Sequence, residues 1–196
     1  NSPVITGVSL PNIPYKIGDI VLLTVSVEDD GGDTYTALHM NSTTRINSTT
    51  YLVQGQVQAG FPDIAAEDDV TASFVFIDSA GNESVQFDAS FSQDNDPHDF
   101  NRPTISAVSI LNAAMNVGDA VTVSITAGEA GLALTSGSIN GVAVTGFTDN
   151  GGGNYTAIYT VLEGHTDRAA GDEIPVSFLL ADPAGNTSAV FTAPAT

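Results

Sequence analysis

The sequence of 196 residues contains no cysteine and no tryptophan, and only four of its residues are lysine or arginine. Without cysteine, no disulfide bond can hold the fold together. Without tryptophan, the chain lacks the residue that commonly lines a sugar-binding cleft. No apolar run approaches the roughly 18 residues that a membrane-spanning helix needs, and nothing at the amino end has the pattern of a signal peptide.

The scarcity of basic residues leaves a large acidic excess. Against four basic residues stand 23 aspartate and glutamate residues, and the formal net charge is −19. Such a surface repels nucleic acid and anionic lipid, so we expect neither nucleic-acid binding nor membrane insertion. Two explanations of the excess stay open at this point: solubility in a salty medium, or carboxylates gathered to bind a cation.

The two halves of the sequence repeat each other. Pro3-Val-Ile-Thr-Gly-Val-Ser-Leu returns 100 residues later (103 − 3) as Pro103-Thr-Ile-Ser-Ala-Val-Ser-Ile. Asp78-Ser-Ala-Gly-Asn returns 104 residues later (182 − 78) as Asp182-Pro-Ala-Gly-Asn. We therefore predict two domains, residues 1–92 and 103–196, joined by a linker at 93–102. Repetition at the period of a domain is typical of an in-line array, and the ends of the sequence look cut from a longer chain.

Each copy has the alternating pattern of β-strands. Val21, Leu23, Val25 and Val27 alternate with more polar residues, and similar runs lie at 4–10, 35–40, 51–58, 70–77 and 85–91. Ile139-Asn-Gly-Val predicts a tight hairpin turn, and residues 149–154 predict a longer one. About seven short strands in roughly 95 residues predict an all-β protein of two immunoglobulin-like sandwiches arranged end to end.

The carboxylates cluster at the predicted junction. In a seven-strand sandwich with strands A to G, the A–B and E–F loops lie at the end where strand G exits, and the B–C and F–G loops lie where strand A enters. This topology directs acidic loops of the first repeat, the linker and loops of the second repeat, which include Glu129 and Asn186, toward one place. The predicted metal ligands are Asp19, Asp63, Glu67, Asp68, Asp69, Asp94, Asn95, Asp96, Asp99, Asn101 and Asp182.

A cation would relieve the repulsion among these side chains. Two like charges about 4 Å apart cost roughly 1 kcal/mol in water and more near a protein surface. Calcium takes six to eight oxygen ligands in tolerant geometry, whereas magnesium demands a tighter octahedron, so we expect Ca²⁺. The alternative is a solvated acidic linker without metal.

The acidic segments resemble the calcium junctions of cadherins: Asp94-Asn95-Asp96 in the linker, Glu67-Asp68-Asp69 in the E–F loop and Asp182 in the next F–G loop. The whole repeat is similar to the tandem Ig-like or cadherin-like extender repeats of giant bacterial surface adhesins, including the RTX type. The resemblance implies a secreted, cell-surface chain whose repeats bind calcium between domains and project a terminal binding module. The linker departs from the cadherin pattern Asn-Asp-Asn-Ala-Pro, since it has Asn95-Asp-Pro-His-Asp.

Other polar residues have simpler interpretations. Asp78 and Asn82 are predicted to make a tight turn in which side chains bond their own backbone, and Asp119 is predicted to have turn chemistry only. For Asp182, turn chemistry and metal binding are both open. The three histidines, His39, His98 and His165, share no spacing with a nucleophile, and we expect them at the surface. The tyrosines are expected in the core or on strand faces.

Two functions follow from this pattern. The first is a non-catalytic, calcium-stiffened spacer in an extracellular adhesin, monomeric and in contact with neighbouring repeats of its own chain. The second is a module that recognises a carbohydrate or a partner protein through its loops, which the longer loop at 149–154 favours. We expect no enzymatic activity, because acids confined to the loops at sandwich ends are explained by junctions.

Overall fold

A computed structural model describes residues 2–65, 68–92 and 98–194. The chain divides into two compact units, Asn1–Asn101 and Arg102–Thr196. This division assigns residues 98–101, which the sequence analysis places in the linker, to the first unit. None of the described residues lies in a helix, and none therefore forms a helix long and apolar enough to cross a membrane.

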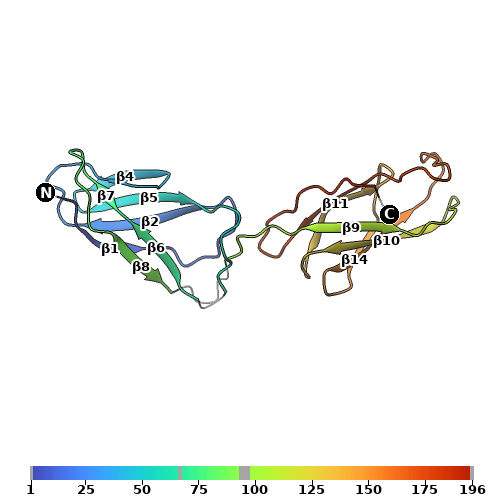
Figure 1. The fold of residues 1–196 in the computed structure, drawn as a ribbon, viewed down its shortest axis with the longest axis horizontal. Coiled ribbons are helices and arrows are strands. Elements are labelled where there is room, and N and C mark those ends of the chain that lie inside the picture. The colour runs from blue at the N-terminus through green and yellow to red at the C-terminus, as the bar shows by residue number, and fades with distance from the viewer. Residues whose placement is uncertain (1, 66–67, 93–97, 195–196) are drawn as a thin grey trace. The chain divides into compact units, whose positions relative to one another are not determined.

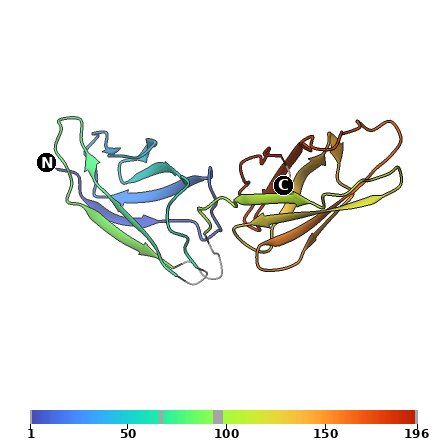
Figure 2. The ribbon, with the colours of Figure 1, turned by 45° about the vertical axis from the view of Figure 1, so that its right-hand side comes forward.

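The first unit is a two-sheet sandwich of short antiparallel strands. Its larger sheet has the order β1-β2-β5-β4, and the smaller pairings are β3 with β7 and β6 with β8. This is the immunoglobulin arrangement, in which the first, second, fourth and fifth strands form one layer. The strands can be followed from blue to green in Figure 1 and from a second direction in Figure 2. Their bounds are β1 (Ile5–Ser9), β2 (Ile20–Val27), β3 (Thr36–Ala37), β4 (Ser42–Asn47), β5 (Thr50–Gln56), β6 (Val70–Phe74), β7 (Phe76–Ile77) and β8 (Phe87–Phe91).

The second unit repeats this topology. Its larger sheet has the order β13-β14-β10-β9, and its smaller sheet has the order β12-β11-β15. A bridge between Phe178 and Phe191 adds the last segment beside β15. The bounds are β9 (Ile105–Ile110), β10 (Ala120–Ala127), β11 (Ala133–Ile139), β12 (Val142–Ala143), β13 (Gly146–Asp149), β14 (Asn154–Thr160) and β15 (Val176–Ala181). The predicted fold class, all-β with tandem Ig-like domains, is confirmed.

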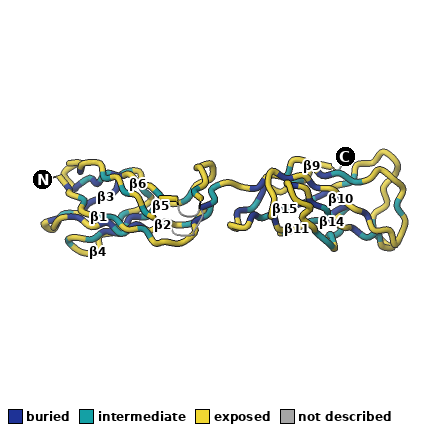
Figure 3. The backbone as a smooth tube through the Cα atoms, turned by 90° about the horizontal axis from the view of Figure 1, so that it is seen from below, coloured by how far each residue is buried: buried dark blue, intermediate teal, exposed yellow. Residues whose placement is uncertain are grey.

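The apolar residues that alternate in the sequence are the residues that are buried in the strands. In β2, Leu23, Val25 and Val27 are at most 4% exposed, while the residues between them are more accessible. In β10, Val123 and Ile125 are buried in the same way. Figure 3 shows buried stretches, in dark blue, along the strands of each unit. Each unit thus has its own apolar core, in which all five tyrosines take part as buried residues.

Both predicted hairpin turns are present in the second unit. Ile139 pairs with Val142, and the two residues between them have positive φ, 51° at Asn140 and 80° at Gly141. Positive φ at both central positions defines a type I′ turn, whose twist matches that of the strands it joins. The longer turn at residues 149–154 connects β13 to β14.

Two strand predictions in the first unit were wrong. Of the segment predicted at 35–40, only Thr36–Ala37 forms a strand, and the strand Ser42–Asn47 was missed altogether. Ser42–Asn47 is an edge strand that pairs only with β5, and nearly all of it is exposed. An edge strand that is exposed to solvent on both faces has no alternation of apolar and polar residues, so the sequence pattern could not reveal it.

The two units share their turn chemistry at the predicted offsets. Gly18 N–H donates to the carbonyl of Val57 (3.0 Å), and Gly118 N–H donates to the carbonyl of Val161 (2.8 Å). The donor Gly118 lies 100 residues after its counterpart Gly18 (118 − 18), and the acceptor Val161 lies 104 residues after its counterpart Val57 (161 − 57). The four additional residues of the second copy are therefore inserted between these positions, and residue equivalences can be assigned on either side.

Candidate functional site

The turn at Asp78 satisfies its own carboxylate. One oxygen, Oδ1, accepts from the backbone N–H groups of Ala80 (3.0 Å) and Asn82 (2.7 Å), and Oδ2 accepts from the side-chain amide of Asn82 (2.8 Å). The hydrogen bond from the Asn82 side chain, followed by that from its backbone, lowers the pKa of Asp78. The predicted turn chemistry of Asp78 and Asn82 is confirmed.

The equivalent carboxylate of the second unit is arranged differently. Asp182 is 5% exposed, and its Oδ1 accepts from the backbone N–H of Asn186 (2.8 Å). Its Oδ2 is buried, and no described residue donates a hydrogen bond to it. A buried carboxylate oxygen without a donor is costly, and a cation is one group that satisfies it. Asp182 therefore combines turn chemistry with one oxygen suited to a metal ion.

Three of the predicted ligands in the first unit lie together. Asp63 Oδ1 accepts from the backbone N–H of Phe100 and from the side-chain amide of Asn101, both at 2.8 Å. Asp99 Oδ1 accepts from the backbone N–H of Asn101 at 3.0 Å. These bonds hold the linker segment His98–Asn101 against the 60–64 loop. One oxygen of Asp63 and one of Asp99 are thus engaged with protein donors.

The linker segment is also paired through its backbone on both sides. His98 and Ile64 exchange two backbone hydrogen bonds of 2.9 and 3.0 Å, and Asp99 N–H donates to the carbonyl of Tyr15 at 3.3 Å. Gly60 N–H donates to the carbonyl of Phe100 at 3.1 Å. The segment therefore lies between the 15–19 turn and the 60–64 loop as a short extended strand.

His98 is buried, and its prediction as a surface residue was wrong. It is 1% exposed, and its ring stacks on Tyr15 (centroids 5.4 Å apart) and on Phe100 (5.9 Å). Its Nδ1 accepts a hydrogen bond from the backbone N–H of Tyr15 at 3.1 Å. His39 is exposed, as predicted, and His165 is partly buried against Tyr159, with ring centroids 5.6 Å apart. Phe100, an aromatic residue within a polar linker, was the one sequence signal of this packing.

The remaining predicted ligands are dispersed or lie outside the described residues. Asp19 Oδ2 accepts from Lys16 N–H (3.0 Å), the same contact that Asp119 makes with Asn116 N–H (2.7 Å). Asp69 Oδ2 accepts from the hydroxyl of Ser90 at 2.6 Å, and Asp68 N–H donates to the carbonyl of Ala65 at 3.1 Å. Four predicted ligands fall outside the described residues: Glu67, Asp94, Asn95 and Asp96.

Within residues 2–65, 68–92 and 98–194, no three histidine, aspartate or glutamate side chains converge as a metal cluster. In the second unit, the Glu129 carbonyl accepts from the hydroxyl of Tyr155 (2.9 Å). Among the described residues, the oxygen atom best suited to bind a metal ion is therefore a single one, Asp182 Oδ2.

The first unit contains an ion pair between a buried carboxylate, Asp30, and the partly exposed side chain of Arg45. The Arg45 guanidinium donates to both oxygens of Asp30 (2.6 and 2.8 Å), and the Tyr51 hydroxyl donates to Oδ2 (2.7 Å). The side chain of Asp30 has no exposed area. Hydrogen bonding by Arg45 holds the pKa of Asp30 far below its usual range, and burial raises the pKa of Tyr51 to about 12. All the acceptors are used within the protein, so this network supports the fold.

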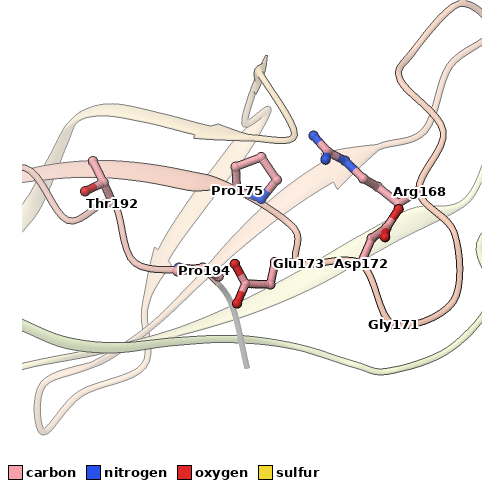
Figure 4. Close-up of a pocket in the computed structure, with 7 residues that line it drawn as sticks. All are labelled: Arg168, Gly171, Asp172, Glu173, Pro175, Thr192 and Pro194. Atoms are coloured by element: carbon pink, nitrogen blue, oxygen red, sulfur yellow. The ribbon is translucent and has the colours of Figure 1, made fainter.

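The second unit carries an open pocket of about 520 Å³ beside its 162–175 loop. Figure 4 shows Arg168, Asp172 and Glu173 along this loop, with Thr192 and Pro194 on the C-terminal segment opposite. Asp172 Oδ2 accepts from the N–H of Ala169 at 2.9 Å, and Arg168 Nε donates to Asn140 Oδ1 at 2.8 Å. The Asp172 carboxylate and the Arg168 guanidinium therefore both make hydrogen bonds within the second unit.

No family model and no curated sequence matches this chain. The fibronectin(III)-like modules of CbhA from Clostridium thermocellum are 12% identical over 96% of this chain and 93% of that one, with a TM-score of 0.36. The Ig1+Ig2 segment of DIP-gamma is 13% identical over 100% and 96% (TM-score 0.33), and the titin Ig tandem A164-A165 is 9% identical over 100% and 96% (TM-score 0.30).

Proposed function

We propose that this chain is a non-catalytic spacer segment of a large secreted adhesin, and that calcium bound near its interdomain linker stiffens it. The observation that carries the proposal is the buried carboxylate of Asp182, whose Oδ2 receives no hydrogen bond from the described residues. Its counterpart in the first unit, Asp78, has both oxygens satisfied. Because Asp182 has an oxygen without a donor and Asp78 does not, the proposed cation binds at the Asp182 loop and has no equivalent at the Asp78 loop.

The linker supplies the other donors of the proposed site. Residues 93–101 contain three aspartates, Asp94, Asp96 and Asp99, and two asparagines, Asn95 and Asn101. Their side chains offer oxygen ligands of the kind that calcium prefers. The proposal assigns Asp94, Asn95 and Asp96 as further ligands of the same ion. Extracellular modules bind calcium weakly, with dissociation constants of about 10⁻⁴ to 10⁻³ M, which suits a cell-surface location.

Catalysis has little support in the geometry. Glycoside hydrolysis needs two carboxyl groups facing each other across a cleft. In the 520 Å³ pocket of the second unit, Asp172 instead accepts from the N–H of Ala169 in its own loop. A pocket whose aspartate is already committed to loop structure is poorly suited to general acid or base chemistry.

Ligand recognition by the 149–154 loop is the second candidate function. Asp149 accepts from the backbone N–H of Gly131 (2.8 Å) and of Gly151 (2.7 Å), so this glycine-rich loop is tied to its neighbour. A loop held in one conformation loses less entropy on binding than a flexible one. A glycan array and a pull-down distinguish the two functions, because a spacer shows no ligand and still responds to calcium.

Calorimetric titration of calcium into two variants tests the assignment of ligands. Asp96→Ala should weaken calcium binding at least about tenfold, since a lost carboxylate ligand of about 1.4 kcal/mol has that effect. Asp119→Ala should leave the affinity unchanged, because the Asp119 carboxylate accepts from Asn116 N–H within its own turn. Equal affinities of the two variants would show that the site is misplaced.

A further inference from the structure

The 162–175 loop of the second unit is built like the loop that holds the linker segment in the first unit. The same backbone hydrogen bond occurs in both: Asp68 N–H donates to the Ala65 carbonyl at 3.1 Å, and Asp172 N–H donates to the Ala169 carbonyl at 3.0 Å. The residues of the first unit that bind the linker segment therefore have counterparts. Gly60, Asp63, Ile64 and Tyr15 correspond to Gly164, Asp167, Arg168 and Met115.

In the first unit these groups act together as a peptide-binding edge. Ile64 pairs with His98 through its N–H and carbonyl, and Gly60 N–H binds the carbonyl of Phe100. The Asp63 carboxylate accepts from Phe100 N–H. Beside them Tyr15 stacks on the His98 ring. The linker segment is thus recognised by backbone donors, one carboxylate and one apolar side chain.

The counterpart groups of the second unit are accessible. Gly164, Asp167 and Arg168 are exposed, and the backbone N–H groups of Gly164 and Arg168 donate to none of the described residues. Arg168 directs its guanidinium to Asn140, which leaves its backbone edge clear. The pocket of Figure 4 opens beside Arg168.

Apolar side chains are exposed on this loop and on the neighbouring 116–119 turn, whose Gly118 N–H donates to the Val161 carbonyl. Val117 is 64% exposed and Leu162 is 54% exposed. Met115 is partly exposed, whereas Tyr15, its counterpart under the linker segment, is only 6% exposed. Covering such side chains with the ring of a bound peptide removes apolar area from water, which favours binding. The edge therefore offers both hydrogen-bonding groups and apolar area to an extended peptide.

We propose that the 162–175 loop of the second unit binds an extended peptide of the chemistry of the linker segment, with an imidazole or aromatic ring two residues before a second aromatic ring. Such a peptide pairs with Arg168 through its backbone, donates an N–H to the Asp167 carboxylate and packs its first ring on Met115. Main-chain pairing supplies affinity and the ring supplies specificity. The binding is independent of calcium and extends beyond the proposed spacer function.

A peptide with the sequence of residues 97–102, Pro-His-Asp-Phe-Asn-Arg, tests this inference. It is titrated into the full ¹⁵N-labelled chain in EDTA, so that failure of the calcium proposal cannot affect the result. We expect saturable amide shifts at Gly164, Arg168 and Met115, with a dissociation constant on the order of 1 mM, because a short flexible peptide loses its ordering entropy on binding.

Two controls make the result decisive. A peptide with alanine in place of its His and Phe should bind at least about tenfold more weakly. Asp167→Ala should weaken binding of the original peptide, whereas Glu163→Ala, an exposed carboxylate on the same loop, should not. The inference is overturned by absent shifts at millimolar peptide, by equal binding of the two peptides, by equal effects of the two variants, or by shifts confined to the first unit.

Discussion

Asp30→Asn is expected to lower the melting temperature of the first unit by more than about 10 °C and to leave that of the second unit unchanged. The substitution removes the negative charge that the Arg45 guanidinium and the Tyr51 hydroxyl share. The Arg45 side chain is 35% exposed and stays partly solvated. The loss therefore comes from the charge-assisted hydrogen bonds at the buried Asp30 carboxylate, which contribute about 1.5 to 3 kcal/mol. Because the two units are separately compact, differential scanning calorimetry should resolve the loss as a shift of one transition.

The neighbouring Asp29→Asn is the matched control. Asp30 accepts a hydrogen bond from the backbone N–H of Gly32 (2.9 Å). Asp29 accepts the equivalent bond from the backbone N–H of Gly31 (2.9 Å), but this bond is exposed to solvent. We expect a shift of less than about 2 °C, as for most surface substitutions. If the two variants melt alike, the Asp30 network contributes nothing beyond its local turn.

The same network gives the first unit a distinct dependence on pH. Hydrogen bonding from Arg45 depresses the folded-state pKa of Asp30 below its unfolded value, which is about 3.9. A depressed pKa contributes stability that is fully present above the unfolded value and is lost as pH falls through the folded value. Below about pH 4, the first-unit transition of the wild type should therefore fall more steeply than that of Asp30→Asn.

Calcium is expected to raise the melting temperature of the second unit by roughly 10 to 20 °C. A ligand at 100 times its dissociation constant contributes about 2.7 kcal/mol, and one kcal/mol corresponds to roughly 4 to 8 °C in a domain of this size. The physical reason is that the ion satisfies Asp182 Oδ2, which is buried without a donor among the described residues. Scanning calorimetry in calcium and in EDTA measures the difference.

Two equivalent variants separate this effect from turn stability. Asp182→Asn should abolish the calcium response, and in EDTA it should be at least as stable as the wild type because it removes an unsatisfied buried charge. Asp78→Asn should keep the full response while losing its bond from the Asn82 amide. A melt that chelation leaves unaltered in the wild type contradicts the calcium proposal.

The fold was predictable because its signals are local. The alternation of Leu23, Val25 and Val27 has the period of a strand, and each residue is buried as the period requires. The Asn140-Gly141 pair specifies a type I′ turn from two residues alone. Internal repetition then doubled the strand signals, since both copies carry them at an offset of 100 residues before the four-residue insertion and 104 after it.

The features that were missed depend on distant partners. Ser42–Asn47 lacks apolar alternation, and its Arg45 bonds to Asp30, 15 residues away in the chain. His98 is surrounded by acidic residues in the sequence, yet it is buried through contact with Tyr15, 83 residues away. Likewise, nothing in the nearly identical Asp78 and Asp182 motifs distinguishes their carboxylates, whose donors differ only in the folded chain.

Small-angle scattering of the full chain with calcium and with EDTA tests the central claim most directly, combined with far-ultraviolet circular dichroism on the same samples. The account predicts a narrower distribution of interdomain angles with calcium and a nearly constant dichroism, because each core consists of ordinary alternating strands. A scattering profile that chelation leaves unaltered would contradict calcium stiffening and favour a solvated acidic linker.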